Sequence, residues 1–286
     1  MKVAIIGTGV MGKWFASFAK KNLGEAMIVS RDFAKAKRVA KELNVRAETR
    51  EKAVAEADVV LVAVPIAVTP EFIKSLAKQM KKGALLADIA SVKSDVVDAM
   101  KKLDADLELV SLHPLFGPGA TGVKGKDFVA VPVKPRKRYA ELKQRLIKLG
   151  ARVTEMEAEE HDRMMAIVQC MTHFVLISYL AALKSMGAER IKLVGTPMFA
   201  TLQDFAKAIS AGNSELYGEL QVSNKHAKLA RSALIDACCS LDEAFKANNV
   251  EAVRRILEDA QEMWGKAETQ AAYKKLYVRF EGEKRK

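Results

Sequence analysis

The first half of the chain alternates short apolar segments with amphipathic segments of helical period. The apolar segments predict buried strands over Lys2–Ile6, Met27–Ser30, Asp58–Val64, Ala84–Ile89, Glu108–Ser111 and Phe128–Val133. The amphipathic segments predict helices over Lys13–Lys21, Asp32–Leu43, Thr69–Met80 and Arg138–Leu149. Strands that alternate with helices form a parallel sheet wound through right-handed crossovers. We therefore expect an α/β domain with a parallel sheet over residues 1–150.

The second half of the chain has long apolar-periodic segments and almost no strand-like alternation. These segments predict helices within His161–Met186, Glu189–Ser210, Ser214–Ala247 and Val250–Tyr277, and hence an all-α domain over residues 151–286. The segment Met164–Leu183 is apolar on nearly every face. A helix of this kind needs burial in a large core or between subunits, so we expect this domain to form a homodimer.

Composition favours a globular protein of the cytoplasm. Half of the 286 residues are hydrophobic, and the longest apolar stretches are shorter than the roughly 20 residues of a membrane helix. We therefore expect no membrane span and no signal peptide. The three cysteines, Cys170, Cys238 and Cys239, have neither the number of a disulfide framework nor the spacing of metal ligands.

The net charge of +12 raises the question of a nucleic-acid partner. The basic residues are spread along the chain, and no aromatic side chains interleave with them as in a nucleic-acid groove. We expect no nucleic-acid partner, because the charge is equally suited to attracting small anions.

A glycine turn follows the first predicted strand. It has the G-x-G-x-x-G spacing and consists of Gly7, Thr8, Gly9, Val10, Met11 and Gly12. In a dinucleotide-binding turn the first glycine permits the tight turn, the second lets a pyrophosphate approach the backbone, and the third allows close helix packing. The free N–H groups of the following helix favour the phosphates. Because the motif follows a strand and opens a helix, it predicts a Rossmann domain that binds NAD or NADP.

The end of the second predicted strand bears on the choice of cofactor. Asp32 lies about 20 residues past Gly12, as a ribose-binding acid does in NAD enzymes, but it also stands where the next helix needs an N-cap. Ser30 occupies the last strand position and Arg31 can pair with a 2′-phosphate. We therefore favour NADP over NAD.

Two further strand ends add candidate residues at the same edge of the sheet. Val64 and Pro65 end a buried strand where ligands bind in such sheets, although a simple strand terminator explains them as well. The next strand leads to Ser91 and Lys93, which we expect at the edge of the crevice, while Asp88 is equally explained as a helix cap.

His113 follows a strand and begins the loop His113-Pro114-Leu115-Phe116-Gly117-Pro118-Gly119. Prolines constrain such a loop and hold the side chain in place. Imidazole titrates near neutrality, so His113 is a candidate base for a substrate hydroxyl whose carbon loses hydride. The alternative is a loop histidine that bonds only to the backbone.

These motifs together resemble the prephenate dehydrogenase family, including its arogenate-using members, and the resemblance covers most of the chain. It implies that His113 is the catalytic base and that Ser91 assists it. It also implies that Gln169 and His173, on the first long helix of the second domain, contact the substrate. A histidine on an apolar helix is often a core residue, and this alternative stays open for His173.

The sequence departs from the family where an arginine binds the substrate carboxylate. The matching stretch Asp204-Phe205-Ala206-Lys207 offers Lys207, which supplies charge without the bidentate fork of arginine. Arg163 and Lys225 are alternative bases for this role. Tyr217 is a further candidate for the pocket wall, or a core aromatic.

The resemblance implies oxidative decarboxylation of prephenate to 4-hydroxyphenylpyruvate. Arogenate is the alternative substrate, and no residue distinguishes the two. Another hydride-transfer enzyme with a helical second domain is a rival, although such enzymes lack the His113 loop. A non-catalytic dinucleotide sensor is a rival of a different class, and it would bind cofactor without turnover.

Overall fold

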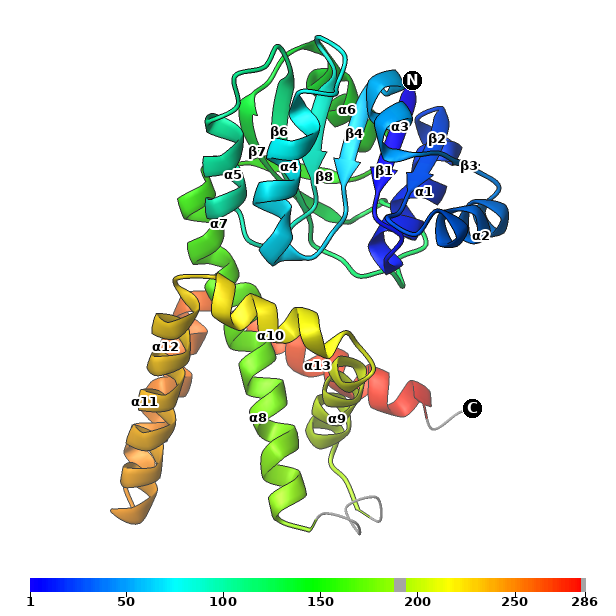
Figure 1. Cartoon of the computed structure of the whole chain (residues 1–286). Helices are drawn as coiled ribbons and strands as arrows, with labels where there is room; N and C mark the ends of the chain where they lie inside the picture. Colours follow the sequence, from blue (N-terminus) through cyan, green and yellow to red (C-terminus); the bar gives the residue numbers. More distant parts are fainter. Residues whose placement is uncertain (188–193, 284–286) are drawn as a thin grey trace. The chain divides into compact units, whose positions relative to one another are not determined.

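The computed structural model describes residues 1–187 and 194–283, and the chain divides into two compact units (Figure 1). The first unit covers Met1–Met165 and contains the sheet. The second covers Ala166–Lys286, and every secondary-structure element in its described part is a helix. This architecture confirms the predicted α/β domain followed by an all-α domain.

The first unit is built on an eight-stranded sheet of order β3-β2-β1-β4-β5-β6-β7-β8. Its strands are β1 (Lys2–Ile6), β2 (Glu25–Val29), β3 (Arg46–Ala47), β4 (Val59–Val62), β5 (Leu85–Asp88), β6 (Glu108–Pro114), β7 (Asp127–Lys134) and β8 (Arg152–Glu155). All neighbouring strands are parallel except β6 and β7, which are antiparallel. No helix lies between β6 and β7, so the chain turns back beside β6 instead of crossing over the sheet.

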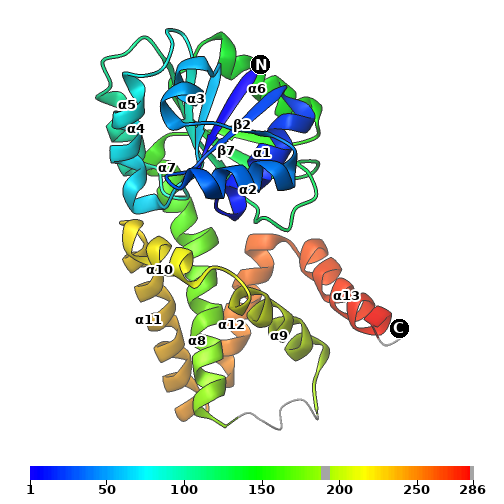
Figure 2. The same cartoon turned by 45° about the vertical axis from the view of Figure 1, so that its right-hand side comes forward.

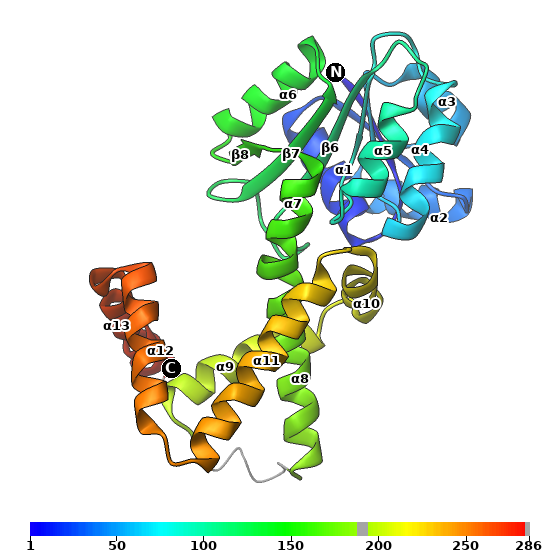
Figure 3. The same ribbon diagram turned by 90° about the vertical axis from the view of Figure 1, so that its left-hand side faces the viewer.

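Helices cover both faces of this sheet. They are α1 (Val10–Asn22), α2 (Phe33–Leu43), α3 (Arg50–Glu56), η1 (Ile66–Val68), α4 (Thr69–Ala77), α5 (Ser94–Lys101), α6 (Lys137–Lys148) and α7 (Ala158–Met165). Side chains of α1, α2 and α6 share one hydrophobic core with the strands. Figure 3 shows α3, α4 and α5 on the opposite side of the sheet from α6. Both faces are therefore buried, as parallel strands require.

The first unit extends beyond the predicted boundary after Gly150. The strand β8 pairs with β7, and α7 packs on α5, so both elements belong to the sheet unit. The sequence pattern does not predict β3, α3, α5 or β8. These elements are short, and β8 is a mostly exposed edge strand whose residues Arg152-Val153-Thr154-Glu155 are largely polar.

The second unit begins in a π-helical segment, Ala166–Met171, that continues into α8 (Thr172–Ser185). Figure 2 shows the helices that follow, which are α9 (Pro197–Ser210), α10 (Ser214–Ser223), α11 (Ala227–Lys246), α12 (Val250–Trp264) and α13 (Lys266–Glu283). The segments predicted over 214–247 and 250–277 are each broken into two helices, at Asn224 and at Gly265, which has a φ of 84°. The predicted start of the helix over 189–210 lies partly outside the described residues.

The helix α8 leaves some of its apolar side chains exposed in the single chain. It has no buried residue, and Val175 and Ile177 are 38% and 41% exposed. The continuous helical stretch Ala158–Ser185 is long and apolar enough to span a membrane by length and composition, a feature that the apolar run lengths alone do not indicate. Length and composition alone do not distinguish such a span from a helix that is covered by protein.

Candidate active site

The glycine turn lies between β1 and α1 and has the shape that a phosphate group needs. Gly7 has a φ of 125°, and a Cβ there would lie 2.2 Å from the carbonyl oxygen of Ala63. A Cβ on Gly12 would lie 2.1 Å from the carbonyl oxygen of Gly7, whereas a Cβ on Gly9 would meet no atom within 4 Å. The helix α1 has neither a side-chain cap nor an acidic residue in its first turn. Its N–H groups and the open side of Gly9 therefore fit a dinucleotide phosphate.

The end of β2 separates the two interpretations of Asp32. The Asp32 carboxylate accepts a hydrogen bond from the Lys35 backbone N–H at 3.0 Å and caps α2. Arg31 is exposed, and the Ser30 hydroxyl lies 3.5 Å from the Thr8 hydroxyl of the glycine turn. The structure thus favours the capping role of Asp32 and leaves Ser30 and Arg31 beside the turn.

The candidate residues of the first unit gather at the carboxyl ends of four adjacent strands. The glycine turn follows β1, Val64 and Pro65 follow β4, and Ser91 follows β5. Because β1, β4, β5 and β6 are parallel neighbours, these turns share one edge of the sheet with His113, near the end of β6. The Thr69 hydroxyl donates a hydrogen bond to the Pro65 carbonyl oxygen at 2.9 Å and fixes the turn after β4.

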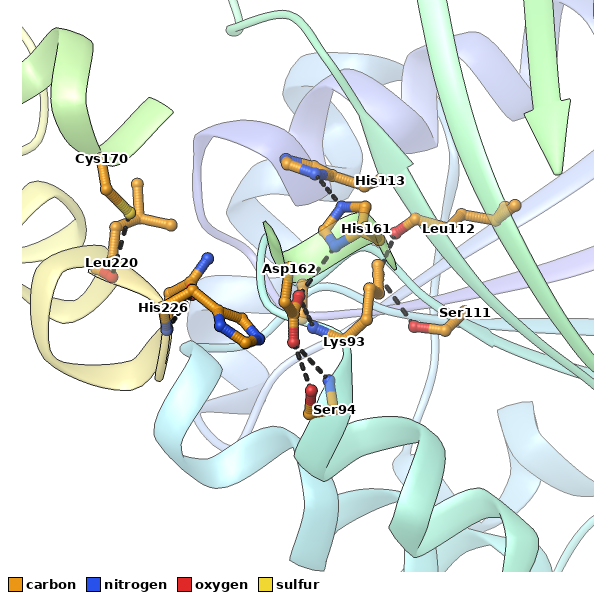
Figure 4. A network of polar contacts seen from close by, with 12 residues as sticks. Lys93, Ser94, Ser111, Leu112, His113, His161, Asp162, Cys170, Leu220 and His226 are labelled. Atoms are coloured by element: carbon orange, nitrogen blue, oxygen red, sulfur yellow. Dashed lines mark hydrogen bonds and ion pairs between the residues drawn. The ribbon is translucent and has the colours of Figure 1, made fainter. Parts of the chain in front are cut away.

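His113 is the first member of a chain of buried hydrogen bonds (Figure 4). Its Nδ1 lies 2.8 Å from Nε2 of His161, and Nδ1 of His161 lies 2.8 Å from Oδ1 of Asp162. His113 comes from β6, while His161 and Asp162 come from α7. His113 is 2% exposed and His161 is fully buried. A side chain held in this way has little rotational freedom, which suits a group that must meet a reacting atom.

Asp162 is anchored at the beginning of α5. Its carboxylate accepts hydrogen bonds from the backbone N–H groups of Lys93 and Ser94, at 2.8 and 2.9 Å, and from the Ser94 hydroxyl at 2.5 Å. The helix α5 has no cap from its own N-cap side chain, so Asp162 supplies the negative charge that this helix N-terminus favours. Burial alone raises the pKa of Asp162, but the hydrogen bonds from His161 and Ser94 bring that pKa below its usual range.

Lys93 lies beneath this chain of hydrogen bonds and does not face the crevice. Its ammonium is fully buried and donates to Oδ1 of Asp88 at 3.2 Å, to the Ser111 hydroxyl at 2.8 Å and to the Leu112 carbonyl oxygen at 2.6 Å. This position contradicts the prediction that Lys93 lies at the edge of the crevice as a candidate substrate contact. A buried ammonium needs an opposite charge, and Asp88 supplies it, which also corrects the view of Asp88 as a simple helix cap.

The electrostatic surroundings favour neutral imidazoles. Burial, followed by the nearby charge of Lys93, lowers the pKa of His113 well below its ordinary value. Burial also lowers the pKa of His161, although the hydrogen bond to Asp162 acts in the opposite direction. His113 is therefore neutral, and able to accept a proton, over a wider pH range than a solvent-exposed histidine.

The other predicted substrate residues lie in the helical unit. Gln169 is part of the π-helical segment and His173 is on α8, where its ring centroid lies 4.7 Å from that of Tyr217. Burial lowers the pKa of His173. Lys207 on α9 has a side chain that is 70% exposed and lies 3.9 Å from Asp204. The contact of Gln169, His173 and Lys207 with a substrate stays a prediction.

His161 and Asp162 are not among the residues that the motifs predict. The only sequence signal for them is an adjacent histidine and aspartate at the start of a helix, in a chain with four histidines. Neither residue belongs to a local motif, because β6 and α7 are brought together only by the fold. Within residues 1–187 and 194–283, no group of histidine, cysteine and acidic side chains has the arrangement of a metal site.

The fold and the glycine turn define a nucleotide-binding protein of the Rossmann class with a helical second domain. Models of the prephenate dehydrogenase nucleotide-binding and dimerization domains match residues 15–154 and 157–259. The chain belongs to the prephenate dehydrogenase family.

Individual relatives agree with this assignment. The chain is 31% identical over 96% of its length to a probable arogenate/prephenate dehydrogenase of Methanocaldococcus jannaschii, and the match spans 63% of that protein. It is 30% identical to 4-amino-4-deoxyprephenate dehydrogenase of Streptomyces pristinaespiralis, over 74% of this chain and 72% of that one. Prephenate dehydrogenase from Aquifex aeolicus, in complex with hydroxyphenyl propionate and NAD+, has the same fold, with a TM-score of 0.72. It is 20% identical and covers 92% of this chain and 98% of its own.

Proposed function

We propose that the chain catalyses the oxidative decarboxylation of prephenate to 4-hydroxyphenylpyruvate with a nicotinamide dinucleotide as oxidant. The observation that carries this proposal is a buried His113, held by His161, on the sheet edge that also bears the open glycine turn. The names of the relatives support the substrate class, and the complex of the Aquifex aeolicus enzyme with NAD+ supports the cofactor class.

In this mechanism His113 takes the proton of the ring hydroxyl. A nicotinamide dinucleotide held at the glycine turn would supply the hydride acceptor, and loss of hydride from the hydroxyl-bearing carbon would give a dienone. The bond to the ring carboxylate then breaks, its electron pair enters the ring, and carbon dioxide leaves. The resulting phenolate recovers the proton from His113, so the imidazole is neutral again after each turnover. The protein mainly positions the hydroxyl and holds the carboxylates.

Several further residues have proposed roles around this base. Ser91, half-buried in the turn after β5, would orient the substrate hydroxyl toward His113. Gln169, His173 and Lys207 would bind the rest of the substrate, and the net charge of +12 favours a dianion.

Arogenate is the second candidate substrate, since the Methanocaldococcus jannaschii relative carries both names. The two substrates differ in a keto or an amino group on the side chain, away from the ring hydroxyl. The test is kcat/KM of the purified chain with prephenate and with arogenate, each with NAD and NADP. We expect turnover with prephenate at the higher kcat/KM, and a clear preference for arogenate would reverse the substrate assignment.

We further propose that the cofactor is NADP, bound at Ser30 and Arg31. A charge-assisted contact is worth about 1.5 to 3 kcal/mol, so Arg31→Ala is expected to raise KM for NADP roughly tenfold or more and to change KM for NAD little. Ser30→Asp should reverse the preference, because a carboxylate accepts bonds from the ribose hydroxyls and repels the phosphate. Steady-state kinetics with both cofactors checks this, with Arg50→Ala as a matched surface control. A native protein that prefers NAD would overturn the assignment.

We also propose that the helical unit forms a homodimer through α8. The family model that matches this region is a dimerization domain, and α8 leaves an apolar surface of the kind that a second subunit covers. Sedimentation velocity at micromolar concentration is expected to show a dimer. A stable monomer in detergent-free buffer would contradict the proposal. A chain that stays in solution only when detergent is present would favour a membrane-associated helix instead.

A further inference from the structure

The hydrogen bonds around His161 determine which imidazole nitrogen of His113 carries the lone pair. The Asp162 carboxylate, whose pKa is lowered, only accepts hydrogen bonds, so Nδ1 of His161 must carry a proton. In a neutral ring this leaves the lone pair of His161 on Nε2, which faces Nδ1 of His113 at 2.8 Å. Nδ1 of His113 must then donate, and Nε2 of His113 carries the lone pair.

We infer that His161 and Asp162 are positioning residues that hold His113 in this Nδ1–H tautomer and stabilise its positive charge after proton transfer. This inference rests on the proposed function of His113 as the base. It assigns Nε2 of His113 as the atom that takes the hydroxyl proton. The imidazolium that forms keeps its Nδ1–H bond to His161, whose ring dipole is oriented by Asp162, so the carboxylate itself need not be protonated.

The arrangement is rigid because Asp162 cannot rotate away. Its two oxygens are occupied by the backbone of Lys93 and Ser94 and by the Ser94 hydroxyl, all at the start of α5. Among the charges near His113, the Lys93 ammonium from the turn after β5 lowers its pKa, and the Asp162 carboxylate from α7 lies on the far side of His161. Lys93 disfavours the imidazolium, and the negative charge of Asp162 behind His161 acts in the opposite direction.

A pair of substitutions at His161 separates the hydrogen-bonding role from packing. In His161→Gln the amide oxygen can accept from His113 while the amide nitrogen donates to Asp162, whereas His161→Phe keeps a ring but makes neither bond. We expect His161→Phe to lower kcat about 10- to 100-fold, less than loss of the base itself, with KM values changed less than about threefold. His161→Gln should retain most of the native kcat.

A control is needed for general loosening of the fold. Tyr139→Phe removes a hydrogen bond to Glu155 in the same unit, away from the sheet edge, and is expected to leave kcat unchanged. Equal losses of kcat in His161→Phe and His161→Gln would overturn the positioning role, as would a loss in His161→Phe that appears only in KM.

The tautomer itself can be measured without any substrate. Long-range proton–nitrogen correlation spectra of the isotope-labelled full chain distinguish protonated from unprotonated ring nitrogens, and only four histidines need assignment. We expect the Nδ1–H form for both His113 and His161, against the Nε2–H form that predominates in free imidazole side chains. Finding the Nε2–H form of His113 would overturn the inference. The tautomer measurement does not depend on turnover, so it tests this inference even if the chain does not catalyse the proposed reaction.

Discussion

Replacing His113 with asparagine is expected to lower kcat by about 10² to 10⁴, the range for loss of a general base. Asparagine cannot take up a proton, but its amide N–H can still donate to Nε2 of His161, so the buried hydrogen bond is retained. The loss is then chemical and not a consequence of an unpaired histidine in the core. Steady-state kinetics at saturating substrate and cofactor measures it.

Two controls accompany this substitution. Cofactor affinity, measured by fluorescence titration, should change little, because β4 and β5 separate β6 from the strand that bears the glycine turn. Ser91→Ala should cost less than His113→Asn, since a hydroxyl that only orients the substrate contributes one hydrogen bond. Near-native turnover in His113→Asn would remove His113 from the mechanism, and an equal loss in Ser91→Ala would give Ser91 the main role.

The pH dependence of kcat/KM gives a further check on His113 in the native protein. Burial and the Lys93 ammonium lower the pKa of His113, so the imidazole stays unprotonated and active as the pH falls below 6.5. The acid limb of the profile is therefore expected below the ordinary histidine value, and an acid limb above it would contradict these surroundings.

The second large effect is expected at the glycine turn, where two substitutions of the same kind should act differently. A Cβ on Gly12 would lie 2.1 Å from the Gly7 carbonyl oxygen, and neither backbone segment can move aside cheaply. Gly12→Ala should thus lower the free energy of unfolding by roughly 3 kcal/mol, at the upper end for overpacking. Gly9→Ala meets no atom within 4 Å and should leave stability within about 1 kcal/mol of native.

Cofactor binding, in contrast, should be sensitive to Gly9→Ala. In the folded protein, Gly9→Ala places a methyl group where the pyrophosphate approaches the backbone, so dinucleotide affinity should fall at least about tenfold. Denaturant unfolding and cofactor titration of both variants measure the two effects. If Gly9→Ala bound NAD and NADP as tightly as the native chain, the glycine turn would not be the phosphate site.

Sequence patterns predicted the parallel core of the sheet and the change to helices because both depend on local periodicity. They also predicted the family, since the glycine turn and the His113 loop are contiguous motifs. The strand β7 was predicted, but its antiparallel direction was not, because strand direction depends on the connection. The edge strand β8 was missed because it has little apolar alternation.

The sequence predicts less of the candidate site than of the fold. His161 and Asp162 reach His113 only because α7 returns to the sheet, and spacing along the chain does not reveal such a contact. The place of Lys93 after a strand predicts a position at the crevice, but the side chains of a turn can point either toward solvent or into the core. Its buried partners Asp88 and Ser111 determine that it points inward.

The most direct test of the proposed reaction is its stoichiometry. Purified protein would be incubated with prephenate and saturating oxidised cofactor, and the reduced nicotinamide, the carbon dioxide and the aromatic product would be quantified together. We expect equal molar amounts of reduced nicotinamide, carbon dioxide and 4-hydroxyphenylpyruvate, because hydride loss and decarboxylation occur in one turnover. Protein that binds the cofactor tightly but reduces none of it, with either prephenate or arogenate present, would contradict the proposed reaction and favour a dinucleotide-binding protein without dehydrogenase activity.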